Sequence, residues 1–283
     1  MQKSVYLCLF FVLFTATLSA KTIAVVVSRK LPIYEQALQG IKEKLANRQH
    51  TVFFLDASAN VRRTRERLRA YPFDCYIPIG GAATREVITL AKNKIVVCCL
   101  TLYEPKESSA KFHVVPYLPP GAELAKKLKK LQPSVLHRIG TIWCHDSLRD
   151  IIHNYKEDFK LEQCPFVVTK VDSPREVPRA LKKLAKRIDA FLLLPEPSLM
   201  QKEALRHVLL TLLQKGKVII AFSPSLVRAG ALFSLSYPPK KIGRYAGQLA
   251  IKLLFEETED VEMPKLEFSK NERVARFLGI KSK

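Results

Sequence analysis

Several features that mark specialised classes of protein are absent or scarce in this sequence. Six cysteines among 283 residues are too few for a scaffold held together by disulfides. No CxxC pair or comparable metal-ligand spacing occurs, and no spacing of Ser, His and Asp indicates a hydrolytic triad. After residue 20, no apolar run reaches the roughly 20 residues that a membrane-spanning helix needs. The sequence therefore predicts a globular chain that holds no metal or cofactor and catalyses no reaction.

Acidic residues are also few beside basic ones: 26 Asp and Glu against 47 Lys and Arg, a net charge of +21. The basic residues gather on predicted helices, within 62–69, 126–130 and 182–187, between leucines and alanines. This pattern is typical of solvated helix faces. A nucleic-acid-binding protein would need a recognition motif, and none is present, so we expect no nucleic-acid partner. Weak attraction to an anionic membrane surface is a secondary expectation.

The first twenty residues differ in character from the rest of the chain. Lys3 precedes an apolar run from Val5 to Phe14, and the small, weakly polar segment 15–20 follows it. This order is typical of a secretory signal peptide, with cleavage after Ala20. The open alternative is an uncleaved N-terminal anchor. In both cases we expect the body of the protein outside the cytoplasm, in a periplasm or an equivalent extracytoplasmic space.

The cysteines after residue 20 are five in number: Cys75, Cys98, Cys99, Cys144 and Cys164. Cys98 and Cys99 are adjacent inside an apolar run, as small core residues often are. One disulfide between Cys144 and Cys164 is left open as an alternative. We expect a fold that does not depend on disulfides.

Strand and helix patterns alternate along the first part of the chain. The continuous β-branched run 22–27 is typical of a strand that is buried on both faces. Apolar residues at helical spacing follow it. Strands are predicted at 22–27, 51–55, 75–79, 95–100 and 112–115, and helices at 33–46, 61–70 and 83–91.

The same alternation restarts after the segment 117–121, which contains three prolines or glycines in a row. Strands are predicted at 138–143, 166–170, 190–194 and 217–222, and helices at 122–131, 147–160, 176–187, 199–214, 240–256 and 271–279, with an extended segment at 261–268. Alternating strands and helices form parallel sheets that are covered by helices. The sequence therefore predicts an α/β protein with two similar Rossmann-like lobes.

Several local motifs in this order resemble one known family. The most specific is Phe222 to Leu254, FSPSLVRAGALFSLSYPPKKIGRYAGQLAIKLL; the others are Asn271 to Ile280, Ile79 to Thr84, Tyr103 to Pro105 and Leu193 to Pro197. They resemble the substrate-binding proteins of ABC transporters, of the type that binds tryptophan and other aromatic amino acids. The resemblance covers nearly all of residues 22–281. It implies the type I periplasmic-binding-protein fold, in which two lobes are joined by hinge strands.

That fold implies lobes that are discontinuous in sequence. The resemblance places residues 22–115 and 224–257 in the first lobe, and residues 116–223 and 258–283 in the second. Four turns differ from the family pattern. Gly81-Ala82 replaces Thr-Pro, Glu104 replaces Asp, Glu196-Pro197 replaces Asp-Asn, and the turn 144–147 replaces an Asn-rich turn. Because such turns line the cleft, the family's ligand does not carry over directly.

The candidate site follows from the fold class, because ligands of open α/β sheets bind at the carboxyl ends of the strands. Four turns qualify: 28–34, 80–84, 144–147 and 195–198. At the second of these, the N–H groups of Gly81, Ala82, Ala83 and Thr84 open a helix, where a ligand carboxylate would be favoured. The alternative is an ordinary glycine turn into a helix.

Acidic and aromatic residues complete the candidate site. Asp146 or Glu196 would take a ligand's ammonium group, although Asp146 would serve equally well as a helix N-cap. Tyr34 and Tyr103 would supply an aromatic face, or else pack in the core. The full set of candidate ligand-binding residues is Tyr34, Gly80, Gly81, Ala82, Ala83, Thr84, Tyr103, Glu104, Asp146, Ser147, Glu196 and Ser223.

The resemblance implies an exported solute-binding protein that captures a small, carboxylate-bearing ligand, such as an amino acid, and presents it to an ABC permease in the membrane. Three alternatives remain open. One is a ligand sensor that partners a membrane signalling protein. Another is a sugar-repressor-like regulator, against which the lack of an N-terminal DNA-binding helix pair counts. The third is a diverged member whose cleft binds no metabolite.

Overall fold

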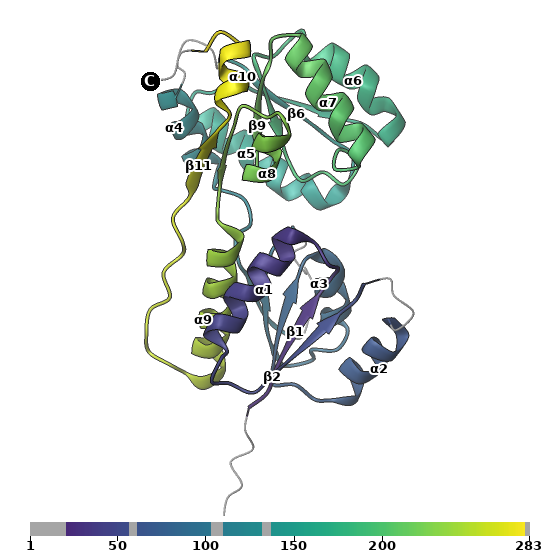
Figure 1. The fold of residues 1–283 in the computed structure, drawn as a ribbon, viewed down its shortest axis with the longest axis vertical. Helices are drawn as coiled ribbons and strands as arrows, with labels where there is room; N and C mark the ends of the chain where they lie inside the picture. The colour runs from purple at the N-terminus through teal and green to yellow at the C-terminus, as the bar shows by residue number, and fades with distance from the viewer. Residues whose placement is uncertain (1–20, 57–60, 103–109, 132–136, 281–283) are drawn as a thin grey trace, which may run out of the picture.

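The computed structural model describes residues 21–56, 61–102, 110–131 and 137–280, and these form two α/β lobes stacked end to end (Figure 1). Each lobe contains one sheet with helices on both faces. The predicted fold class, two lobes with mainly parallel sheets, is therefore confirmed. Within these residues, no helix combines the length and the apolar character that crossing a membrane requires.

The first lobe has a five-stranded parallel sheet in the order β2-β1-β3-β4-β5. All five residues of β1 are buried, because helices cover both faces of this central strand. Ile23, Val25 and Val27 face α1 and α9, and Ala24 and Val26 face α2 and α3. The elements are β1 (Ile23–Val27), α1 (Pro32–Lys44), β2 (His50–Phe54), α2 (Val61–Ala70), β3 (Cys75–Ile79), α3 (Gly81–Ile88), β4 (Ile95–Cys98), β5 (Lys111–Val114) and α9 (Pro239–Phe255).

Glycines allow α1 and α9 to touch backbone to backbone. A Cβ atom on Gly40 would overlap the carbonyl oxygen of Lys240, and one on Gly243 would overlap the carbonyl oxygen of Ala37. A Cβ on Gly247 would lie 3.0 Å from the Cβ of Lys44. The late helix α9 is thereby fixed to the first element of the fold, although about 200 residues separate them in sequence.

The second lobe has a six-stranded sheet in the order β11-β10-β9-β8-β6-β7, in which only β11 is antiparallel to its neighbour. Its elements are α4 (Gly121–Leu131), β6 (Ile139–Trp143), the 3₁₀ turn η1 (Asp146–Leu148), α5 (Arg149–Leu161), β7 (Phe166–Lys170), the 3₁₀ turn η2 (Pro174–Glu176), α6 (Val177–Leu184), β8 (Ala190–Leu193), α7 (Lys202–Gln214), β9 (Val218–Ala221), α8 (Pro224–Ala229), β10 (Phe233–Ser236), β11 (Glu267–Lys270) and α10 (Glu272–Phe277).

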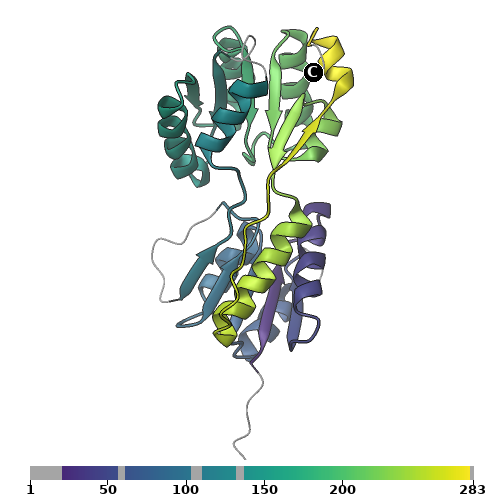
Figure 2. The same ribbon diagram turned by 90° about the vertical axis from the view of Figure 1, so that its left-hand side faces the viewer.

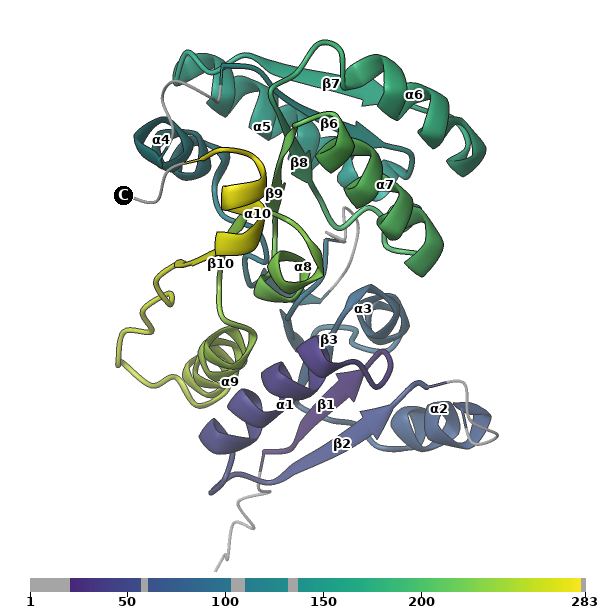
Figure 3. The same cartoon turned by 45° about the horizontal axis from the view of Figure 1, so that its top comes forward.

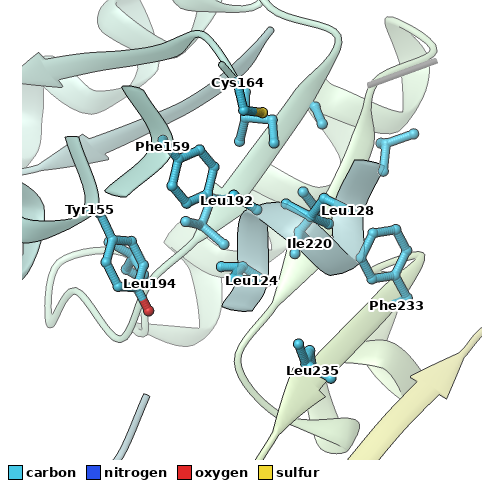
Figure 4. Close-up of a cluster of buried hydrophobic side chains, with 14 of the residues drawn as sticks. Leu124, Leu128, Tyr155, Phe159, Cys164, Leu192, Leu194, Ile220, Phe233 and Leu235 are labelled. Atoms are coloured by element: carbon cyan, nitrogen blue, oxygen red, sulfur yellow. The ribbon is translucent and has the colours of Figure 1, made fainter. Parts of the chain in front are cut away.

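Two apolar layers enclose this second sheet. On one face, side chains of α4 and α5 such as Leu124, Leu128 and Phe159 pack on Leu192 and Ile220 of the strands (Figure 4). On the other face, α6 and α7 pack on the alternate residues of the same strands. Burying large apolar side chains in this way contributes about 1.5–3 kcal/mol each, which supplies most of the drive to fold.

Three segments connect the lobes: residues 115–120, residues 237–238 and residues 256–266. In Figure 2 the last of these runs beside α9 and rises to β11 in the second lobe. The predicted lobe boundaries need two corrections. Residues 258–266, predicted in the second lobe, run beside α9 (Figure 2), and Met263 packs on the first-lobe core. Residues 224–236 are predicted in the first lobe. The sheet order places them in the second.

The reason lies in α8 and β10. Pro224 begins a short helix in the position where a proline has no amide bond to lose. The strand that follows pairs Phe233 with Ile220 of β9 and with Lys270 of β11. This four-residue strand was not predicted, because it lies in a run of small apolar residues that has no clear period as a whole.

The cysteines form no disulfide among the described residues. Cys75, Cys98, Cys99 and Cys164 are buried thiols, and Cys144 is a half-buried one. The alternative of a Cys144–Cys164 bridge is therefore wrong: Cys164 packs in the layer of α4 and α5, while Cys144 packs with the opposite layer.

Candidate ligand-binding cleft

A cavity of about 880 Å³ lies between the lobes, beside the first connecting segment. Its volume falls in the range of small-molecule sites, about 300–1,000 Å³. The first lobe contributes the segment after β4, and the second lobe contributes η1 and one side of α5. The lining residues are Thr101, Leu102, Val114, Pro116, Tyr117, Leu118, Pro119, Pro120, Gly121, Asp146, Ser147, Arg149, Asp150, Ile151, Asn154, Tyr155 and Asp158.

Two predicted site residues, Asp146 and Ser147, line this cavity. The Asp146 carboxylate is about two-thirds exposed and accepts a hydrogen bond from the Arg149 guanidinium at 2.8 Å. Asp146 begins η1, and the residue before α5 is Leu148, which makes no side-chain cap. The N-cap alternative for Asp146 is therefore wrong, and its carboxylate faces open space beside an arginine.

The cavity is fixed on its hinge side by Tyr155. The Tyr155 hydroxyl donates a hydrogen bond to the carbonyl oxygen of Pro119 at 2.7 Å. Burial raises the pKa of this phenol, so the hydroxyl remains a donor at every physiological pH. This bond connects α5 of the second lobe to the first connecting segment, close to the point where the lobes would bend.

The predicted anion-binding turn before α3 differs from the expectation. The N–H of Ala83 donates to the Ser28 hydroxyl oxygen at 2.9 Å, and the N–H of Thr84 donates to the carbonyl oxygen of Gly80 at 3.0 Å. Ala83 and Thr84 are also fully buried. These two residues therefore cannot meet a ligand, and their part of the predicted site is wrong.

The N–H groups of Gly81 and Ala82 are available to a ligand, as predicted. No described acceptor receives a hydrogen bond from either N–H group. A Cβ atom on Gly81 would lie 3.8 Å from Oγ1 of Thr101, which lines the cavity. The open end of α3 therefore lies next to the cavity, with two amides available to an anion.

Tyr34 and Gly80 lie together in the first lobe, but neither lines the cavity. Gly80 has φ +86°, and a Cβ there would lie 2.7 Å from the Tyr34 hydroxyl oxygen and 2.8 Å from the Ser28 hydroxyl oxygen. Only glycine fits this position without moving the tyrosine. Burial raises the pKa of Tyr34, which keeps its hydroxyl neutral.

Glu196 has no exposed surface, and its carboxylate is already fully bonded. One oxygen accepts from the N–H groups of Cys144 at 3.0 Å and His145 at 3.2 Å. The other accepts from Nδ1 of His145 at 2.5 Å and from the N–H and hydroxyl of Ser198 at 3.3 and 3.2 Å. Glu196 therefore has no position left for a ligand's ammonium group, contrary to the expectation.

The role of Glu196 is instead to join two turns of the second lobe. Burial alone would raise the pKa of this carboxyl, but the hydrogen bonds from Cys144, His145 and Ser198 outweigh burial and lower the pKa. The carboxylate stays ionised and ties the turn after β6 to the turn after β8. The two turns can meet because β6 and β8 are neighbours in the sheet, which the sequence does not show.

His145 is the partly exposed member of this arrangement. Its side chain is 48 % exposed although Nδ1 lies against the buried Glu196, so the Nε2 edge is the exposed one. His145 directly precedes Asp146, which lines the cavity, but His145 is not itself a lining residue. The sequence pattern places the turn 144–147 at the cleft, but it does not show that His145 meets the carboxylate of Glu196.

Ser223, another predicted site residue, does not line the cavity. Ser223 is buried before α8, where its hydroxyl lies 2.8 Å from the Ser225 hydroxyl. Tyr103 and Glu104 lie outside the described residues. In the part of the chain that the structure describes, no group of three or more His, Cys, Asp and Glu side chains could hold a metal ion.

No family model and no curated protein sequence matches this chain. Solved structures do match it. An ABC domain from Streptococcus pneumoniae in complex with L-Trp has a TM-score of 0.68 at 17 % identity, over 93 % of this chain and 96 % of that one. A conserved domain protein from Vibrio cholerae has a TM-score of 0.68 at 14 % identity, over 93 % and 95 %. A ligand-free, open substrate-binding protein with adhesive properties from Clostridium difficile has a TM-score of 0.67 at 17 % identity, over 93 % and 96 %.

Other similar structures include a periplasmic ribose ABC transporter protein from Conexibacter woesei, with a TM-score of 0.59 at 13 % identity over 92 % of this chain and 95 % of that one. A LacI transcriptional regulator from Lactobacillus brevis has a TM-score of 0.60 at 18 % identity, over 87 % and 99 %. These neighbours are binding proteins and regulators. At such identities the likeness establishes the fold alone, and the fold of this chain is that of the two-lobed type I periplasmic binding proteins.

Proposed function

We propose that this chain is an exported solute-binding protein that captures a small molecule between its lobes and delivers it to an ABC permease. The observation that carries the proposal is the cavity of about 880 Å³ lined by both lobes and by the segment that connects them. A ligand in such a cavity contacts both lobes at once. Its binding energy therefore favours the closed arrangement, in which the two lobes come together around it.

The charges of the cavity favour a ligand that carries an amine. Among the described residues, Asp146, Asp150 and Asp158 line it with one cation, Arg149, although the protein as a whole is strongly positive. Asp146 is the most suitable acceptor, because its carboxylate is open to the cavity and is held in place by Arg149. Closure would strengthen such a contact by excluding water from it.

The opposite side of the cavity favours a carboxylate and an apolar group. At the start of α3, the N–H groups of Gly81 and Ala82 can donate hydrogen bonds to an anion such as a carboxylate. Leu102 of the first lobe provides apolar surface on this side, and Ile151 of α5 provides apolar surface on the side of Asp146. We infer an amino acid with an apolar side chain as the ligand, and an aromatic one is consistent with the resemblance and with the L-Trp-bound structural neighbour.

Catalysis has no part in this proposal. The protein would act outside the cytoplasm, after cleavage behind Ala20 or anchored by the uncleaved segment. N-terminal sequencing of the exported protein distinguishes the two, because cleavage gives Lys21 as the first residue, whereas an anchored chain begins at the original N-terminus.

A thermal-shift screen of the purified protein against the twenty amino acids and a set of simple sugars tests ligand capture. A ligand at one hundred times its Kd stabilises the folded state by about 2.7 kcal/mol. For a chain of this size we expect a rise in Tm of about 5–10 °C with at least one apolar amino acid. A screen in which only sugars raise Tm would overturn the ligand class, and one without any response would overturn solute capture.

Delivery to a permease needs a separate experiment, because a sensor would capture the same ligand. Uptake of the labelled ligand is compared in cells with and without the gene for this chain. Loss of uptake supports the transport role, and unchanged uptake with an altered transcriptional response supports a sensor.

A further inference from the structure

Five cations line a second concavity, of about 430 Å³, on the second lobe. No acidic residue is among its lining residues, and Pro178 is the sixth member. Figure 3 places α6, which carries most of them, at the end of the second lobe far from the first lobe. None of these residues lines the ligand cavity. We call this surface the α6 basic groove, formed by Arg175, Arg179, Lys182, Lys183 and Lys186.

The sequence places these cations on one side of a strongly amphipathic helix. Val177, Leu181 and Leu184 are buried against the sheet. The cations follow at steps of four, three, one and three residues, which keeps them on the opposite, exposed face. Along a helix axis, the eleven-residue span corresponds to about 16 Å.

These cations lack the carboxylate partners that several basic residues on α2 and α9 have. On α2, Arg62 pairs with Glu66, and Arg65 pairs with Glu86. On α9, Arg244 pairs with Glu43. In contrast, no groove cation forms an ion pair with a carboxylate of the described residues, which are those at 21–56, 61–102, 110–131 and 137–280.

Helix stability explains only part of this charge. Lys182 and Lys183 lie in the last turn of α6, where a cation complements the helix dipole. Arg175 and Arg179 lie at the other end, where the dipole disfavours a cation. Like charges three and four residues apart also repel each other. An anion bound in the groove would relieve both effects.

The residue types in the groove define the chemistry of its ligand. Among the described residues that line the groove, none is an aromatic on which a nucleobase would stack, and none is an Asn or Gln that would read a base edge. None of them is a large apolar residue that would enter a lipid bilayer. Arginine binds phosphate with two parallel hydrogen bonds, and lysine binds it as a point charge. A row of such cations in a concavity can bind a linear molecule whose negative charges repeat along its length.

We propose that the α6 basic groove binds a linear polymer that carries a phosphate group on each repeat unit. The polymer lies along α6 and contacts the cations in succession. The two sources of this chemistry are an inorganic polyphosphate and a phosphodiester polymer such as poly(glycerol phosphate). The site is separate from the ligand cavity and does not depend on solute capture.

Binding of a fluorescently labelled, short inorganic polyphosphate to the purified protein tests the proposal. With five phosphate contacts, the logarithm of the affinity should fall against the logarithm of the salt concentration with a slope of about −3.5. The affinity should then fall about 100-fold between 50 and 200 mM salt. Unlabelled poly(glycerol phosphate) is added as a competitor, and competition identifies the phosphodiester source.

The decisive variant is R179Q/K182Q/K186Q, which removes three exposed cations from the groove. Its matched control is K127Q/K129Q/K130Q on α4, which removes the same number of exposed cations from a helix of the same lobe. We expect the groove variant to lose at least tenfold in affinity and its salt slope to fall by about two. The control should stay within about twofold of the parent protein, and circular dichroism should show equal folding of all three.

Three results would overturn the proposal. The first is no binding of polyphosphate by the parent protein at 50 mM salt. The second is an equal loss of affinity in the α4 control, which would show attraction by net charge alone. The third is groove-dependent binding to vesicles that contain phosphatidylglycerol without binding of polyphosphate, which would identify a membrane surface as the partner.

Discussion

At the scale of single residues, the second-lobe wall of the cleft depends on the buried carboxylate of Glu196. Five hydrogen bonds from Cys144, His145 and Ser198 hold it, and through it the turns after β6 and β8. These bonds fix the backbone next to Asp146, which lines the cavity. Glu196 therefore helps to position Asp146, although Glu196 itself contacts no ligand.

Glu196→Gln should destabilise the protein by about 2 kcal/mol at pH 7, because an amide NH₂ would face N–H donors that now meet a carboxylate. The folded state lowers the pKa of Glu196 below its ordinary value of 4.5, so its contribution is present above that pH and is lost as the pH falls through the folded-state value. Urea unfolding of both proteins at pH 7 and at pH 4 or below measures this. A difference between them that stays the same at both pH values would contradict the prediction.

Asp146→Asn should leave stability within about 0.5 kcal/mol, because the side chain is exposed. For an amine-bearing ligand identified by the thermal-shift screen, we expect about a tenfold loss of affinity, since the variant removes the charge that faces the ammonium group. Isothermal titration calorimetry measures the Kd. Asp172→Asn, an exposed change away from the cavity, is the matched control, and equal affinity in both variants would show that Asp146 does not contact the ligand.

At the scale of elements, the packing of α1 on α9 determines whether the first lobe can form. The two helices approach so closely that Gly40 and Gly243 lie against backbone atoms, with no room for a side chain. Flexible side chains can move aside, but a backbone carbonyl inside a helix cannot move without loss of hydrogen bonds. The contact also joins residues from opposite ends of the sequence, so it forms only when nearly the whole chain has been synthesised.

Gly243→Ala should destabilise the protein by about 3 kcal/mol or more, because its Cβ would overlap the backbone of Ala37. Thermal unfolding followed by circular dichroism measures the change. Gly81→Ala is the matched control: its Cβ would meet only Arg85 and Thr101, at 3.5 Å or more, and should change stability by less than about 1 kcal/mol. Equal Tm values for the two variants would show that α1 and α9 are able to separate at little cost.

At the scale of the whole molecule, two lobes with separate cores are joined by three connecting segments. The cavity between them lies beside the first segment, so a change in the angle between the lobes changes the shape of the cavity. A rigid pair of lobes with a flexible connection is the arrangement that hinge closure requires.

Small-angle X-ray scattering should therefore give a smaller radius of gyration when the ligand is bound, because the lobes close around it. The comparison is made between the free protein and the protein saturated with the amino acid that raises Tm most. The Asp146→Asn variant, at the same ligand concentration and incompletely saturated, should show a smaller change. An unchanged radius at full saturation would mean that the ligand binds to one lobe without closure.

The sequence by itself determined the succession of elements from β1 to β9, while α8 and β10 were missed. The β-branched run from Ile23 to Val27 predicted a central strand, and the segment 117–121 marked the point where the second lobe begins. These predictions succeeded because periodicity and proline report local conformation and burial. They led to the α/β class and the two lobes, and they placed Asp146 and Ser147 in a turn at the cleft.

Only the tertiary structure decided which groups meet. Local pattern could not show that α8 and β10 belong to the second lobe, because strand order in a sheet is a property of the whole chain. It could not show that the Ser28 hydroxyl accepts a hydrogen bond from the N–H of Ala83, or that His145 Nδ1 bonds to the carboxylate of Glu196. Those partners lie about fifty residues apart in sequence. Each of these hydrogen bonds removes a group that the sequence alone leaves available to a ligand, since a polar group bonded inside the protein cannot also bind a solute.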